Sequence, residues 1–203
     1  MKKYWIIAVI VSFSFSSARA QDESVANQLD KEGERHGKWI KKDAKGNTVY
    51  TGEFHHGVPV DTFRYYSPKG KLKALAIHSE NGTQVKMINY HPNGNIQASG
   101  IYTNKKKDSI WTFYRKDGTL VSKENFSRGK LSDTSRYYYY SGALLKTTHF
   151  EDGVRHGRET LFYDNGQVNK IVYYDHGKLH GSYTVFFPDG DTMSVGQYNQ
   201  DLK

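Results

Sequence analysis

The sequence predicts an all-β fold, an elongated single-layer antiparallel array of about seven stacked β-hairpins. The first observation is a glycine that recurs every 24 residues (70 − 46 = 24) without insertion. The second is turn chemistry, because Asp, Asn or Ser precedes this glycine in five of the seven units. The third is the flanking residues, which are rich in the strand formers Val, Ile, Thr, Tyr and Phe. The turn glycines are Gly46, Gly70, Gly94, Gly118, Gly142, Gly166 and Gly190.

Residues 1–20 lie outside the repeat and have the layout of a secretory signal peptide. Two lysines open the segment, residues 4–15 form an apolar stretch, and residues 18–20 form an Ala-x-Ala cleavage site. We expect cleavage between Ala20 and Gln21, and export to the periplasm, the cell surface or the medium. The alternative is a retained membrane anchor, for which a stretch of this length is short.

Residues 21–36 are polar and without periodicity, and we interpret them as a leader or N-terminal cap. The full chain has 29 Lys+Arg, 21 Asp+Glu and a net charge of +8. Loss of residues 1–20 removes two lysines and one arginine, which leaves 26 − 21 = +5. This excess permits weak contact with an anionic membrane surface and predicts no specific nucleic acid partner. The chain contains no cysteine, which excludes disulfides and thiolate metal sites.

Residues 37–203 form the repeat domain of seven 24-residue units, each predicted to be one hairpin. A Pro, Asp or Asn before a left-handed glycine is typical of a type I turn in a three-residue hairpin loop. Residues two and eight positions after the glycine share parity, so we expect them on one side of the sheet, with the aromatic row from Tyr66 to Phe186 stacked along the strip. A second turn follows eleven residues after each glycine, at Gly57, Asn81, Lys105, Gly129, Gly153, Gly177 and Asp201.

Two blocks near the C-terminus carry a family resemblance. They are residues 157–166 (GRETLFYDNG) and 181–190 (GSYTVFFPDG). The pattern resembles the MORN repeat family, and within it the bacterial 24-residue variant whose members are often labelled YwqK-family antitoxins. The glycine that opens a block, as in Gly37, Gly157 and Gly181, is replaced in the middle units by Asp61, Val85, Ser109 and Asp133. The resemblance implies a strip that is an accessory binding surface for proteins or lipids.

Nine histidines raise the question of a metal site. One repeat position is shared by His36, His156 and His180, and another by His56 and His176. Equivalent positions in neighbouring units lie ~10 Å apart, which is too far for two imidazoles on one zinc ion. The alternative is a metal site within one connection, where His176 could approach His180, or Asp152 could approach His156. We predict no metal site and no cofactor.

The sequence contains no motif for a catalytic nucleophile or a phosphate-binding loop. A single strip also offers no second wall for the opposed carboxylates of a glycosidase. We therefore predict no catalytic residues and a protein that is not an enzyme.

The sequence favours an exported non-enzymatic scaffold that binds a protein partner. The alternative is an antitoxin or immunity protein that neutralises a toxin, which in an exported protein would guard the envelope. The candidate binding face is formed by Tyr163, Tyr173, Tyr183 and Phe187. Simple alternation predicts that these four rings lie on the side of the sheet opposite to Phe162, Tyr174 and Phe186. An exposed row of rings is a usual mark of an interaction site.

Overall fold

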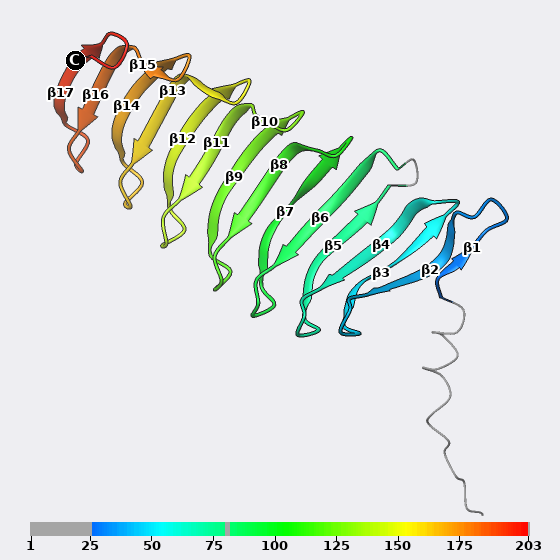
Figure 1. Ribbon diagram of the computed structural model, residues 1–203. Helices are drawn as coiled ribbons and strands as arrows, with labels where there is room; N and C mark the ends of the chain where they lie inside the picture. Colours follow the sequence, from blue (N-terminus) through cyan, green and yellow to red (C-terminus); the bar gives the residue numbers. More distant parts are fainter. Residues whose placement is uncertain (1–25, 80–81, 203) are drawn as a thin grey trace, which may run out of the picture.

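The computed structural model describes residues 26–79 and 82–202, which form one antiparallel β-sheet of 17 strands. Figure 1 shows an elongated, curved strip in which hairpins lie side by side from β1 (Gln28–Leu29) at one end to β17 (Thr192–Tyr198) at the other. The predicted all-β hairpin array is confirmed. Within the described ranges there is no helix, and hence none that could cross a membrane. The predicted signal peptide and its cleavage site at Ala20 and Gln21 lie outside the described residues.

Neighbouring strands pair in chain order. The first half of the strip contains β2 (Arg35–Lys42), β3 (Thr48–His55), β4 (Val58–Tyr66), β5 (Leu72–His78), β6 (Gln84–Tyr90), β7 (Ile96–Thr103), β8 (Lys106–Tyr114) and β9 (Leu120–Ser127). The second half contains β10 (Lys130–Leu131), β11 (Asp133–Tyr138), β12 (Leu144–Glu151), β13 (Val154–Phe162), β14 (Val168–Asp175), β15 (Lys178–Leu179) and β16 (Gly181–Phe186). The two-residue strands β10 and β15 pair with β9 and β14, as do β11 and β16 that follow them.

Each unit turns at its glycine as the sequence predicts. All seven turn glycines have positive φ, from 73° at Gly70 to 101° at Gly190. At Gly166 the amide donates to the Tyr163 carbonyl at 2.9 Å, and the Tyr163 amide donates to Gln167 at 2.8 Å. This pattern closes a three-residue loop with a left-handed last residue. Substitution at Gly166 therefore acts through backbone strain alone, because a Cβ there would meet nothing within 4 Å.

The second turn is a two-residue loop in most units. His176 and Gly177 have φ values of 45° and 89°, and Asn104 and Lys105 have 50° and 64°. Two successive left-handed residues define the type I′ turn, whose twist matches that of the flanking strands. The histidines at these turns therefore occupy backbone positions that tolerate them and that belong to the hairpin.

The residue that opens each block keeps a left-handed backbone even where glycine is lost. Asp61, Ser109 and Asp133 have φ values of 55°, 58° and 58°. The exception is Val85, a β-branched residue that is disfavoured in this region. At Val85 the register between β5 and β6 is unbroken, whereas the β3–β4 and β7–β8 pairs are shifted at the corresponding place.

A second register shift, beside each turn, decides which side chains share a face. In the hairpin of Gly142, Tyr137 pairs with Lys146 and Tyr138 pairs with Leu144, which leaves Leu145 as a bulge. Paired residues point to one side, and consecutive residues point to opposite sides. Residues two and eight positions after the glycine therefore lie on opposite faces, and the expectation of one shared side is wrong.

We name the two sides by their exposure. The packed face carries the side chains five and seven residues before the turn glycine and four, six and eight after it. Every buried apolar side chain of the described chain lies there, namely Phe54, Phe63, Ala74, Ala76, Ala98, Trp111 and Val172. The open face carries the residues four, six and eight before the glycine and two, five and seven after it. The aromatic row from Tyr66 to Phe186 lies on the open face, where its rings are half-buried.

The packed face is held by rings that lie over small residues. A Cβ on Gly52 would come within 2.5 Å of the Phe63 ring, and one on Gly100 within 2.3 Å of the Trp111 indole. Phe63 also meets Phe54 edge-on, with ring centroids 5.1 Å apart. A single sheet thereby obtains close packing without a second layer, because each ring covers the backbone of the neighbouring strand.

Candidate functional site

The open face is the side of the sheet on which large apolar side chains within strands are exposed. Five large apolar side chains within the strands are exposed there, namely Ile77, Ile96, Ile110, Tyr173 and Val195. The other exposed large apolar residues lie in turns, at a bulge, beside the connections or at the ends of the strip. Exposed arginines, Arg64, Arg136 and Arg158, share the open face. Arginine and aromatic residues are enriched in protein interfaces.

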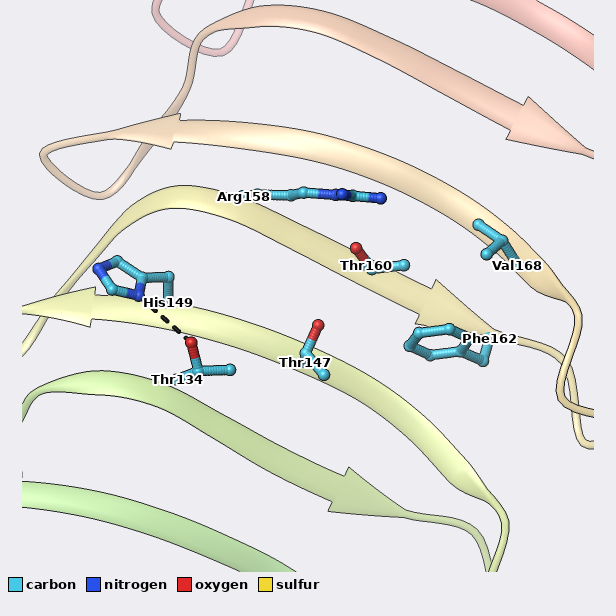
Figure 2. A pocket seen from close by; sticks show the side chains of 7 residues that line it. All are labelled: Thr134, Thr147, His149, Arg158, Thr160, Phe162 and Val168. Carbon is cyan, nitrogen blue, oxygen red and sulfur yellow. Dashed lines mark hydrogen bonds between the residues drawn. The ribbon is translucent and has the colours of Figure 1, made fainter. Parts of the chain in front are cut away.

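Figure 2 shows a pocket on the open face across β11 to β14. Its volume is about 430 Å³. One end is apolar, with Phe162 and Val168, and the other carries Arg158 and His149, whose Nδ1 lies 3.4 Å from the Thr134 hydroxyl. Thr147 and Thr160 line the middle. The pocket can accept a side chain with an apolar body and a polar or anionic end.

A second pocket, of about 580 Å³, lies on the packed face across β4 to β7. Its lining is mostly apolar and includes Val85, Met87 and Tyr102. Burial lowers the pKa of His78 at its wall, and burial together with the neighbouring Tyr50 raises the pKa of Tyr65. The pocket occurs where Met87 stands at the position that Phe63 and Trp111 fill in neighbouring units, so a flexible side chain replaces a ring.

The described residues also contain groups that could hold a metal ion, along the edge formed by the second turns. The ligand atoms of His36, His55 and His56 lie within 4.8 Å of one another, as do those of His156, Asp175 and His176. The sequence-based comparison of neighbouring units missed these groups because each forms within one hairpin. In the first unit Gly37 pairs with Phe54, which brings His36 beside His55. The structure brings His156 to His176, with ring centroids 5.4 Å apart.

The four residues of the candidate binding face do not lie on one side of the sheet. Tyr173 pairs with Arg158 and is exposed on the open face. Tyr183 lies on the packed face, where its ring covers Gly196. Tyr163 begins a turn, and its hydroxyl donates to the Phe186 carbonyl of the next hairpin at 2.7 Å. Phe187 begins the next turn and is exposed. The predicted arrangement is therefore wrong in geometry, and contact of any of these rings with a partner stays a prediction.

The packed face also contains a buried polar group that the sequence does not reveal. The Glu159 carboxylate accepts a hydrogen bond from the Thr148 hydroxyl at 2.6 Å and lies 3.2 Å from the Lys146 ammonium. Ser122 and Ser135 are buried beside it on the same face. The Glu159 carboxylate is satisfied by its own neighbours, which indicates a structural role.

Comparison with known proteins identifies the class of repeat. The sequence model of the family described as MORN repeat variant matches residues 84–104 and 155–176. Two segments of the chain thus match MORN-variant repeats, and MORN repeats are generally associated with protein or membrane interaction. No curated protein matches the sequence. A solved structure titled "Crystal Structure of TcdB2-TccC3-Cdc42" aligns with 82% of this chain at 15% identity and a TM-score of 0.24. The chain spans 11% of that chain's length, and this likeness carries no argument about function.

Proposed function

We propose that the protein is an exported, non-enzymatic scaffold whose open face binds a protein partner. The observation that carries this proposal is the division of apolar residues between the two faces. Burial on the packed face accounts for Phe63, Trp111 and Val172, whereas Ile96 and Ile110 are 40% and 54% exposed on the open face. Exposed apolar residues that gather on one face, rather than singly over the surface, mark an interaction site.

The chemistry of the open face favours a folded protein over a small ligand. Apolar side chains alternate there with threonines and arginines, as at Thr160 and Arg158, and the pockets are open depressions along the strip. A similar depression recurs near the other end of the strip, where another pocket of about 620 Å³ includes Thr48, Thr51 and Tyr66 from the same rows. Repeated contacts of this kind suit a partner that lies along several units.

The test replaces apolar residues of the open face by lysine and measures partner capture from envelope extract. We expect Ile96→Lys with Ile110→Lys to reduce capture about tenfold or more, as loss of interface anchors typically does. Val154→Lys is the matched control, since Val154 is 44% exposed but lies beside a connection. The captured partner is identified by mass spectrometry, and thermal midpoints show whether each variant is folded. If both folded variants capture the partner equally, the assignment of the open face is wrong.

The finer functional hypothesis is an immunity protein of the YwqK-family antitoxin type. Its support is the resemblance of residues 157–166 and 181–190 to that subtype. The intact mass of the exported protein tests the export that it requires, with Gln21 expected as the first residue. Protection of cells against a toxin encoded by a neighbouring gene tests the immunity role itself, and protection lost in Ile110→Lys would connect it to the open face.

A further inference from the structure

We propose that His36, His55 and His56 bind one divalent transition-metal ion, with zinc as the best-suited species. The three imidazoles meet where the N-terminal segment crosses the turn between β3 and β4. Ring centroids are 5.3 Å apart for His36 and His55, 4.9 Å for His36 and His56, and 4.5 Å for His55 and His56. Imidazole nitrogen is a preferred ligand of zinc, copper and nickel.

The spacing of the ligand atoms fits one ion after small side-chain rotations. Zinc–nitrogen bonds of about 2.0–2.1 Å in a tetrahedron place the nitrogens about 3.4 Å apart. The ligand atoms here lie within 4.8 Å of one another, so they need to approach by about 1.4 Å (4.8 − 3.4) at most. His55 and His56 are exposed and therefore have room to rotate.

A carboxylate already orients one of the rings. The Asp30 Oδ2 lies 2.7 Å from Nδ1 of His56, which leaves Nε2 for the metal. Asp30 in turn accepts hydrogen bonds from the amides of Glu32 at 3.1 Å and Glu34 at 2.8 Å. A carboxylate behind a ligating imidazole is a recurrent feature of zinc sites.

A second observation concerns His36. Its Nδ1 is buried, and no described residue makes a hydrogen bond with it. A buried polar atom without a partner is costly and unusual in a folded protein. A cation held among the three rings would be an electron-pair acceptor for this imidazole. The ligand atoms of Asp30, Glu32 and His56 form a neighbouring group, within 4.8 Å of one another.

The repeat supplies the same arrangement a second time. His156 and His176 stand at the repeat positions of His36 and His56, and Asp175 stands at that of His55. Asp175 Oδ1 lies 3.5 Å from Nδ1 of His156 and 2.6 Å from Nδ1 of His176. In the last unit the corresponding residues are His180, Asn199 and Gln200, which offer a single imidazole. His180 is exposed and is therefore a matched control for the loss of one histidine.

The role of the ion would be structural. It would tie the N-terminal segment that carries Asp30 to the first hairpin, at the N-terminal end of the described strip. The terminal units of a repeat array need such a cap because they contact only one neighbour. The ion thus acts on the stability of the first unit and not on the proposed binding surface.

The experiment measures zinc affinity by competition with a chromophoric chelator, together with the thermal midpoint. We expect His55→Gln to lose one zinc equivalent and the zinc-induced rise in midpoint, and His180→Gln to keep both. Asp30→Asn should weaken zinc binding roughly 10–100-fold without removing a ligand.

Absence of zinc binding in the unsubstituted protein would overturn the proposal, as would equal effects of His55→Gln and His180→Gln. Zinc that survives in His55→Gln but is lost in His176→Gln would assign the ion to the sixth unit and also overturn it. Partner capture by His55→Gln should be unchanged, which separates this test from that of the open face.

Discussion

Replacement of Gly100 by alanine tests the packing of the strip more sharply than any change at a turn. The new Cβ would lie 2.3, 2.4 and 2.5 Å from Cδ2, Cε2 and Cγ of Trp111, where ordinary contacts begin near 3.4 Å. The indole would have to move by about 1.1 Å (3.4 − 2.3). Trp111 is 1% exposed and packs edge-on against Tyr102 at 5.0 Å, so it has little room.

The expected cost combines two terms. Overpacking of a filled core typically costs about 1–3 kcal/mol. Movement of the ring also breaks the hydrogen bond from the Trp111 Nε1 to the Ile101 carbonyl at 3.0 Å, and loss of such a buried bond costs about 1–3 kcal/mol. We expect Gly100→Ala to lower the free energy of unfolding by about 3 kcal/mol in total.

Urea unfolding followed by tryptophan fluorescence and circular dichroism measures this cost. Gly94→Ala is the control, because Gly94 has φ of 94° and open space around its Cβ position; its expected cost is about 1–2 kcal/mol from backbone strain alone. Truncation of Trp111 to leucine in the Gly100→Ala background should recover more than about 1 kcal/mol relative to additivity. A Gly100→Ala protein no less stable than Gly94→Ala, or strict additivity with Trp111→Leu, would refute the packing argument.

Three further predictions concern single residues. Gly166→Val should lower the free energy of unfolding by about 1–3 kcal/mol because φ is positive there. Ser182→Val should lower it less, so equal urea midpoints for the two variants would contradict the hairpin register. Hydrogen bonds from the Tyr140 hydroxyl, the largest cause, and from Thr119 lower the pKa of Asp117 from 3.8 to about 2. The stability from these bonds is present above about pH 4 and is lost as the pH falls toward 2. Tyr140→Phe should therefore reduce this acid-side slope in a series of unfolding curves. Glu159→Ala leaves the Lys146 ammonium and a buried hydroxyl unpaired and should cost about 2 kcal/mol in urea unfolding, whereas an unchanged midpoint would show that the buried group is not structural.

The sequence was sufficient to predict the order and the turns of the strip. A constant glycine period with turn residues before it allows one simple arrangement, a succession of hairpins, and Gly166 has the left-handed φ that this requires. The faces could not be predicted in the same way. A bulge such as Leu145 changes the parity of every residue beyond it, and no residue type marks it, because both faces are partly apolar.

The candidate binding face could likewise be predicted by residue type but not by geometry. Tyr163 and Tyr183 have the residue type of an interface, but one donates a hydrogen bond to the next hairpin and the other covers a glycine. Only side-chain contacts distinguish these roles. The histidine group at His36 was open to prediction, since extension of the hairpin register from Gly37 and Phe54 places His36 beside His55. A comparison of equivalent positions in neighbouring units does not reveal this group, because its three histidines belong to one unit.

The rings that cover glycines define where the strip can be cut and rejoined. Gly52 lies under Phe63 and Gly100 under Trp111, so each small residue and its ring are eleven positions apart (63 − 52 = 11) and belong to successive hairpins. A tandem duplication or a deletion with borders just before the small residue, as in residues 52–75 or 100–123, keeps every such pair intact. A duplication or deletion with borders one residue later separates the glycine from its own ring. The glycine then lies under the ring of a different unit, or under no ring. The exchangeable module is therefore offset from the visible hairpin. Gly196 differs from the other two glycines, because the ring that covers it belongs to Tyr183 of its own hairpin.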